Sequence, residues 1–305
     1  MAKTRYAPDR GLTSRMLVTM FLLGLVYVVF VTAFFVLAPE WGVFALAVAV
    51  VFLLAQYFFS DRMTLFAMHG RVVTPAEAPE LHGVIDRICA LSDAPKPRVA
   101  IADSDVPNAF ATGRNQKKAV VCVTTGLLRR LDPVELEGVL AHEMAHVAHK
   151  DVAVMTIASF LGVCAGLITR FGLQMGLWGG FGRRGNDQNT GLVLLAVVGA
   201  SALAYAVSFL LTRALSRYRE LSADRAAALL TGRPSALASA LTKVTGDIAR
   251  IPTNDLRSAQ PFNAFFFTPA LGRGVSVSSL FSTHPSLDKR LAQLGKISDQ
   301  LSRGA

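Results

Sequence analysis

The segment AHEMAH, residues 141–146, carries two histidines at the spacing of one helical turn. On a helix, His142 and His146 project from the same face, one above the other. Two neutral imidazoles at that spacing can hold one zinc ion, at about 2.0–2.1 Å from each nitrogen. Glu143 can reach an attacking water without being a ligand itself. The segment therefore predicts a zinc site with a general base beside it, and a chance match is the alternative.

A second segment, RELSAD, places Glu220 and Asp224 on one helical face. A catalytic zinc site needs three protein ligands and an open position, and two histidines with one glutamate form a known set. Glu220 can be the third ligand, and Asp224 can orient a ligand imidazole by accepting its other N–H. The alternative is an ordinary charged helix face, on which both acids pair with neighbouring arginines: Arg217, Arg219 and Arg225.

The helix that must carry the two histidines has its own start signal. Asp132 can cap the helix, Pro133 suits its first position, and Glu135 completes a capping-box spacing. Apolar residues then follow at helical spacing and predict one buried face. These residues are Leu136, Val139, Leu140, Met144 and Val147.

Upstream of this helix, the chain predicts a small β-sheet. Residues 98–102 and 118–124 are short apolar runs bounded by turn residues, and residues 108–112 between them form a third candidate strand. Residues 75–90 have helical periodicity. Downstream, Leu192–Leu230 contains one glycine and no proline, which predicts a long helix that ends near Gly232.

The composition favours a membrane protein. The chain has 305 residues, of which 52% are apolar and 17% are charged, whereas soluble domains average about 25% charged residues. The three cysteines share no motif spacing and predict no disulfide framework. Four apolar stretches reach or approach the roughly 20 residues that cross a bilayer. We expect the first to be a retained anchor rather than a signal peptide. They are Met16–Ala38, Trp41–Phe59, Val152–Thr169 and Gly191–Thr212.

The charge pattern predicts the orientation of these spans. The formal net charge is +10, and six basic residues flank the spans on the side that holds both termini, which places that side in the cytoplasm. Anionic lipid headgroups are the expected counter-charge, and nucleic-acid binding is not expected because no basic run alternates with aromatic residues. The six residues are Arg10, Arg15, Arg62, Lys150, Arg213 and Arg217.

The predicted organisation follows from the spans. Residues 1–60 form the tail and first membrane hairpin, and residues 152–212 form the second hairpin with a far-side loop at 170–190. Residues 61–151 and 213–305 together form one cytoplasmic domain. His146 lies six residues before Val152 and Glu220 lies eight residues beyond Thr212. At about 1.5 Å per residue, the metal site is therefore expected roughly 9–12 Å from the span ends.

Taken together, these motifs resemble the HtpX-type membrane zinc metalloproteases, which belong to the larger group that includes the CAAX prenyl-protease endopeptidases. The resemblance covers residues 16 to 295. It rests on the spans, HEMAH followed by Lys150-Asp151, SRYRELSAD, the segment PNAFATG at 107–113 and the segment FSTHP at 281–285.

The resemblance implies roles for particular residues. It makes His142, His146 and Glu220 zinc ligands and Glu143 the general base. It also implies that His284 lies by the metal and donates to the developing oxyanion.

The resemblance further implies an edge strand that pairs with an extended substrate, a form of β-augmentation. A plain structural turn and strand is the alternative. The residues are Asn108, Ala109, Phe110 and Ala111.

The expected fold is mostly α with a small β-sheet: four membrane helices and a cytoplasmic gluzincin-like zinc protease domain. The expected function is hydrolysis of misfolded or damaged membrane proteins, or of other unfolded polypeptides, at the cytoplasmic face of the bacterial inner membrane. A zinc-binding scaffold without turnover and a CAAX-type protease of different specificity are the alternatives. A transporter is disfavoured because the spans carry no charged residue.

Overall fold

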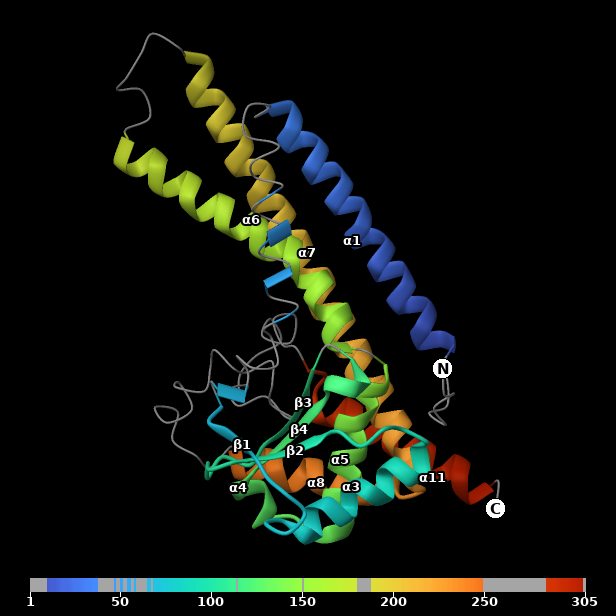
Figure 1. Cartoon of the computed structure of the whole chain (residues 1–305). Coiled ribbons are helices and arrows are strands. Elements are labelled where there is room, and N and C mark those ends of the chain that lie inside the picture. The colour runs from blue at the N-terminus through green and yellow to red at the C-terminus, as the bar shows by residue number, and fades with distance from the viewer. Residues whose placement is uncertain are drawn as a thin grey trace. The chain divides into compact units, whose positions relative to one another are not determined.

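The structure is a computed structural model that describes residues 10–37, 68–113, 115–149, 151–179, 188–248 and 284–303, together with eight positions from 47 to 66. The described chain is mostly helical and contains one four-stranded mixed sheet (Figure 1). This agrees with the class predicted from the sequence.

The chain divides into two compact units. The sheet unit contains residues 1–13, 58–153 and 216–305, and the helical unit contains residues 14–57 and 154–215. The assignment of these parts to membrane and cytoplasm stays a prediction.

The sheet has the strand order β1-β2-β4-β3. β2 and β4 are parallel, while β1 pairs with β2 and β3 pairs with β4 in antiparallel fashion. β3 therefore lies at one end of the sheet. The strands are β1 (Gly70–Val72), β2 (Arg98–Ala102), β3 (Ala109–Thr112) and β4 (Val120–Thr124).

Three of these strands correspond to predicted ones. β4 begins two residues later than expected because Gln116–Lys118 forms a short 3-10 turn (η1), in which the Asn115 side chain accepts a hydrogen bond from the Lys118 amide. The strand β1 was not predicted, because three residues of unremarkable composition become a strand only by pairing with β2.

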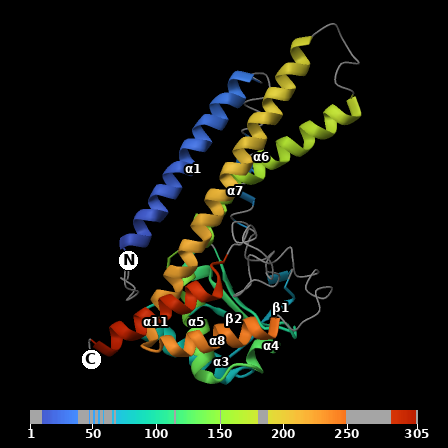
Figure 2. The same ribbon diagram turned by 180° about the vertical axis from the view of Figure 1, so that it is seen from behind.

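Helices cover one face of the sheet, where α3, α5 and α8 lie together in both views (Figure 2). Val99, Val121 and Val123 point into this core, while Ala100 and Cys122 point to the opposite face, as strand alternation requires. The helices of this unit are α3 (Pro79–Ser92), α4 (Thr125–Leu128), α5 (Pro133–Ala148), α8 (Pro234–Ile248), α11 (Leu287–Arg303) and the end of α7 (Gln188–Thr231).

The start of α5 is fixed by the predicted capping box. The Asp132 side chain accepts hydrogen bonds from the amides of Val134 and Glu135, and the Glu135 side chain accepts one from the Asp132 amide. α5 then packs against α3, α8 and β3, so the helix that carries both histidines lies in the core of the unit.

The helix α7 belongs to both units and continues without a break to Thr231. It ends at Gly232, which has a φ of +67°. Glycine tolerates this left-handed conformation without a steric penalty. The predicted long helix and its end near Gly232 are confirmed.

The helical unit contains α1 (Arg10–Leu37) from Ser14 on, α6 (Asp151–Gly179) from Val154 on and the first part of α7. Two described helices are long and apolar enough to cross a membrane: Thr13–Thr32 within α1 and Leu195–Thr231 within α7. Many apolar side chains of α1 are exposed.

Neither the second nor the third predicted span is among the described helices that are long and apolar enough to cross a membrane. A shorter apolar stretch, Val154–Arg170, lies in α6. The predicted span Trp41–Phe59 lies outside the described residues apart from a few single positions. Four spans therefore stay a prediction.

The first half of the loop predicted over residues 170–190 is helical in the structure, since α6 continues to Gly179. Leucine, glutamine and methionine in this stretch favour a helix, and they offset the glycines that indicated a loop. Residues 180–187 lie outside the described residues.

Candidate metal centre

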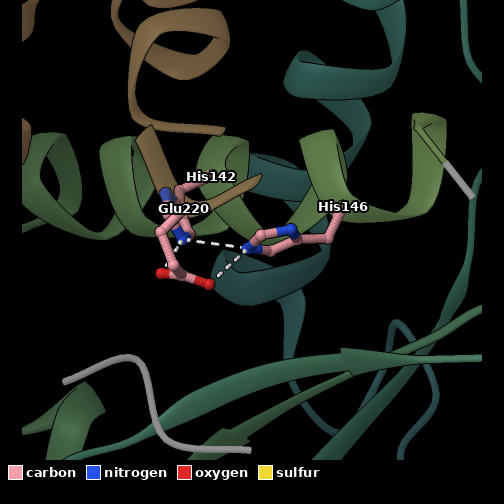
Figure 3. A group of neighbouring side chains, drawn as sticks. All are labelled: His142, His146 and Glu220. Carbon is pink, nitrogen blue, oxygen red and sulfur yellow. Dashed lines mark hydrogen bonds and ion pairs between the residues drawn. The ribbon is translucent and has the colours of Figure 1, made fainter. Parts of the chain in front are cut away.

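The side chains of His142, His146 and Glu220 point toward one another (Figure 3). The two histidines come from successive turns of α5 and Glu220 comes from α7. The Nε2 atoms of the histidines lie 3.2 Å apart. Glu220 Oε2 lies 3.6 Å from Nε2 of His142, and Glu220 Oε1 lies 3.4 Å from Nε2 of His146.

These separations fit a metal ion. With ligands at about 2.0–2.1 Å, the edges of a tetrahedral site are about 3.3 Å long, close to the three distances between these side chains. One ligand atom from each residue can be chosen within 4.8 Å of the others. The donors are two nitrogens and one oxygen, a set suited to zinc.

Beyond the cluster, the other ring nitrogen of His142 faces a carboxylate. Nδ1 of His142 lies 2.9 Å from Asp224 Oδ1. Asp224 is in turn held by Arg290 of α11, whose Nε and Nη2 donate to its two oxygens at 2.7 and 2.6 Å. Asp224 and Arg290 are both buried. This arrangement directs the Nδ1 proton of His142 outward and its Nε2 lone pair toward Glu220.

His146 has an equivalent neighbour. Its Nδ1 lies 2.5 Å from Asp151 Oδ2, at the first residue of α6. Arg219 of α7 pairs with the same oxygen at 2.8 Å. Both imidazoles therefore present Nε2 to the centre of the cluster.

The electrostatics of the cluster favour a positive charge at its centre. Burial alone lowers the pKa of both imidazoles, but carboxylates outweigh it: Asp224 and Glu220 raise the pKa of His142, and Asp151 and Glu220 raise that of His146 to about 10. Burial opposes ionisation of Glu220, yet the three nearby histidines hold its pKa well below the ordinary value. A bound cation supplies the positive charge that these groups attract.

Glu143 lies beside the cluster on α5 and is 5% exposed. Its Oε2 accepts a hydrogen bond from the backbone amide of Ala111 at 3.0 Å. Burial raises the pKa of Glu143, with His142 and His146 opposing the shift. A buried carboxylate of raised pKa is suited to accept and return a proton.

His284 lies against Glu220, with Nδ1 at 3.0 Å from Oε2. The structure thus places His284 next to the predicted ligands. The contact is with Glu220, a partner that the sequence did not suggest. An imidazole that donates to Glu220 through Nδ1 can donate through Nε2 only when the ring is protonated.

The four residues of the predicted substrate strand have different environments. Asn108 pairs with Thr124 through both its amide and its carbonyl, and the Phe110 side chain is buried on the sheet face opposite α5. By strand alternation, the main-chain groups of Ala109 and Ala111 point away from β4. Only these two residues have the geometry for pairing with an added strand.

Sequence reasoning missed three residues around the centre. Arg290 is 66 positions from Asp224 and offered no local signal. Arg219 was considered as a partner for the acids of its own helix, whereas it pairs with Asp151. Asp151 was noted only as part of a motif, although its position five residues after His146 could have suggested a contact.

Comparison with known proteins decides the family. The model of peptidase family M48 matches residues 75–298, which include every residue of the cluster. The chain belongs to peptidase family M48. This M48 chain is therefore a metalloprotease, and the predicted resemblance to HtpX-type enzymes is confirmed by its relatives.

Among these relatives, Protease HtpX homolog 1 of Streptomyces coelicolor is 66% identical over 299 residues, which cover 98% of this chain and 97% of the relative. Protease HtpX homolog 2 of Methanosarcina mazei is 51% identical over 300 residues, which cover 98% of this chain and the whole relative. The M48 chain is a membrane metalloprotease of this type.

One solved structure has a fold similar to that of this chain. The crystal structure of S. mikatae Ste24p matches with a TM-score of 0.53 and 17% sequence identity, and the match covers 94% of this chain and 67% of Ste24p. At this identity the likeness establishes the fold alone.

Proposed function

We propose that the protein is a zinc-dependent endopeptidase that hydrolyses misfolded or damaged membrane proteins at the cytoplasmic face of the bacterial plasma membrane. The observation that carries the proposal is the convergence of His142, His146 and Glu220, with the buried carboxylate of Glu143 beside them. Three protein ligands leave one coordination position open, as in catalytic rather than structural zinc sites.

Zinc held by these three residues would lower the pKa of a water molecule to about 7 and polarise the scissile carbonyl. Glu143 accepts the proton of the attacking water and returns it to the leaving amine. Asp224 orients His142. His284 steadies Glu220 and, when protonated, donates to the oxyanion through Nε2.

Ala109 and Ala111 align the substrate. An extended peptide that pairs with β3 would place its main chain next to Glu143, because the Ala111 amide already reaches that carboxylate. Asn108 and Phe110 hold β3 in place: Asn108 bonds to Thr124 of β4, and the Phe110 side chain packs on the sheet face opposite α5.

The membrane setting rests on the apolar helices within α1 and α7. The basic residues that flank the predicted spans support a cytoplasmic site and contact with anionic lipid headgroups. A site close to the membrane surface would select exposed loops and loosened ends of membrane proteins as substrates.

The test uses the purified full-length protein in lipid vesicles that contain a membrane protein or its destabilised variant. We expect one zinc per chain and faster cleavage of the destabilised variant. Glu143→Gln keeps the metal but lowers hydrolysis at least about 100-fold, whereas His146→Ala loses the metal.

The matched control is Glu137→Gln, an equivalent change on the same helix at a residue that pairs with Arg87; it should keep both metal and activity. Bound zinc without hydrolysis in the parent protein would indicate a scaffold. Full activity in Glu143→Gln would remove the assigned base.

A further inference from the structure

The buried carboxylate of Asp151 lies directly behind one of the imidazoles of the metal centre. Its Oδ2 is 2.5 Å from Nδ1 of His146, and Asp151 is 1% exposed. Since Nδ1 faces a carboxylate, it carries the proton, and the lone pair of His146 lies on Nε2. Nε2 is the atom that faces Glu220.

Arg219 holds this carboxylate from α7. Its Nη2 lies 2.8 Å from the same Oδ2, and it is only 8% exposed. Arg219 immediately precedes Glu220, so one turn of α7 supplies both a ligand of the proposed metal and the partner of Asp151.

One oxygen of Asp151 contacts both the imidazole of His146 and the guanidinium of Arg219. Arginine and a carboxylate pair best through two parallel hydrogen bonds, as Arg290 and Asp224 do. Asp151 instead directs one oxygen to both His146 and Arg219, while its Oδ1 is buried without a hydrogen-bond partner among the described residues.

We propose that Asp151 and Arg219 are positioning residues that fix the ring of His146, as Asp224 and Arg290 fix that of His142. The inference rests on the proposed metal site. The centre then has two arginine–carboxylate–imidazole chains, one for each histidine ligand. Partners of this kind orient a ligand imidazole and raise its basicity, and their loss typically weakens metal binding about 10- to 100-fold.

The test measures zinc affinity of the full-length protein by competition with a chromophoric chelator. Asp151→Asn keeps the shape of the side chain and removes its charge; we expect zinc binding weakened about 10- to 100-fold. Arg219→Gln should weaken zinc binding less, and Arg219→Lys should restore part of the loss because lysine keeps the positive charge.

The matched control is Glu135→Gln, which neutralises another buried acid, paired with Lys243 at 2.6 Å. A merely structural ion pair predicts that Asp151→Asn and Glu135→Gln both lower thermal stability without changing zinc affinity. The visible spectrum of the Co²⁺-loaded protein adds a second readout: its bands should shift in Asp151→Asn and stay unchanged in Glu135→Gln.

Three outcomes are distinguishable. Weakened zinc binding and a shifted Co²⁺ spectrum in Asp151→Asn support the inference. Zinc affinity within about twofold of the parent, with an unchanged spectrum, overturns it while the proposed function stands. Failure of the parent protein to bind zinc overturns both.

Discussion

The backbone amide of Ala111 donates a hydrogen bond to Oε2 of Glu143 at 3.0 Å, which joins the end strand of the sheet to the histidine-bearing helix. The contact connects two sequence motifs that are 32 residues apart. It also gives the amide of Ala111 two possible acceptors, the Glu143 carboxylate and a carbonyl of an added peptide strand.

Ala111→Pro should separate these roles from the stability of the sheet. Proline removes the amide, but this amide points away from β4, so no hydrogen bond of the β3–β4 pair is lost. A hydrogen bond to a charged group contributes about 1.5–3 kcal/mol, so we expect peptide hydrolysis to fall roughly 10- to 100-fold with zinc retained.

Ala111→Ser is the matched variant for this measurement. It keeps the amide and should lose far less activity than Ala111→Pro in a peptide-cleavage assay. Equal rates in the proline variant and the parent would show that the amide has no part in substrate alignment.

Arg290→Met should destabilise the sheet unit strongly. Arg290 is the buried partner of the fully buried Asp224, and removing one member of a buried ion pair typically costs about 3–5 kcal/mol. Denaturant unfolding should show this loss, together with weaker zinc binding through His142. Arg303→Gln, on the same helix at an exposed position, should leave the free energy of unfolding nearly unchanged. An equally small change in Arg290→Met would contradict the assigned contact.

The ion pair between Glu135 and Lys243 predicts a pH dependence remote from the metal centre. Burial opposes ionisation of Glu135, but hydrogen bonds from Lys243 and Ser239 outweigh it and lower its pKa below 4.5. The hydrogen bond to Glu135 raises the pKa of Lys243 above 10.5. The ion pair therefore contributes its full stabilisation between about pH 4.5 and pH 10.5. The stabilisation is lost below this range as Glu135 is protonated and above it as Lys243 is deprotonated.

We expect Glu135→Gln to lower the free energy of unfolding by about 1–2 kcal/mol at neutral pH, since Lys243 is half-exposed and partly screened. The difference in the free energy of unfolding between parent and variant should stay constant from pH 6 to 9 and shrink below about pH 4.5. A difference that widens with acidification would contradict the sign of the pKa shift.

The local parts of this fold could be predicted from the sequence because their signals are local. The capping box of Asp132 and Glu135, the stop of α7 at Gly232 and the strand over residues 98–102 each depend on a few adjacent residues. The spacing of His142 and His146 likewise needs only a helix, and Glu220 with Asp224 needs only a second one.

The remaining features depend on tertiary contacts. The strand β1 exists through its pairing with β2, and the approach of Arg290 to Asp224 depends on how α11 packs. The sequence offers Arg219 several acids at helical spacing as partners. In the structure it pairs with Asp151, because α6 begins at that residue and brings its carboxylate to α7. No periodicity or motif spacing specifies such contacts.

The central claim is that one zinc ion is held by His142, His146 and Glu220. The most direct measurement is a crystal structure of the full-length protein with anomalous diffraction recorded at the zinc absorption edge. We expect a single strong peak about 2.0–2.2 Å from Nε2 of both histidines and from a carboxylate oxygen of Glu220. A peak elsewhere, or a Glu220 carboxylate beyond bonding distance of the metal, would contradict the claim.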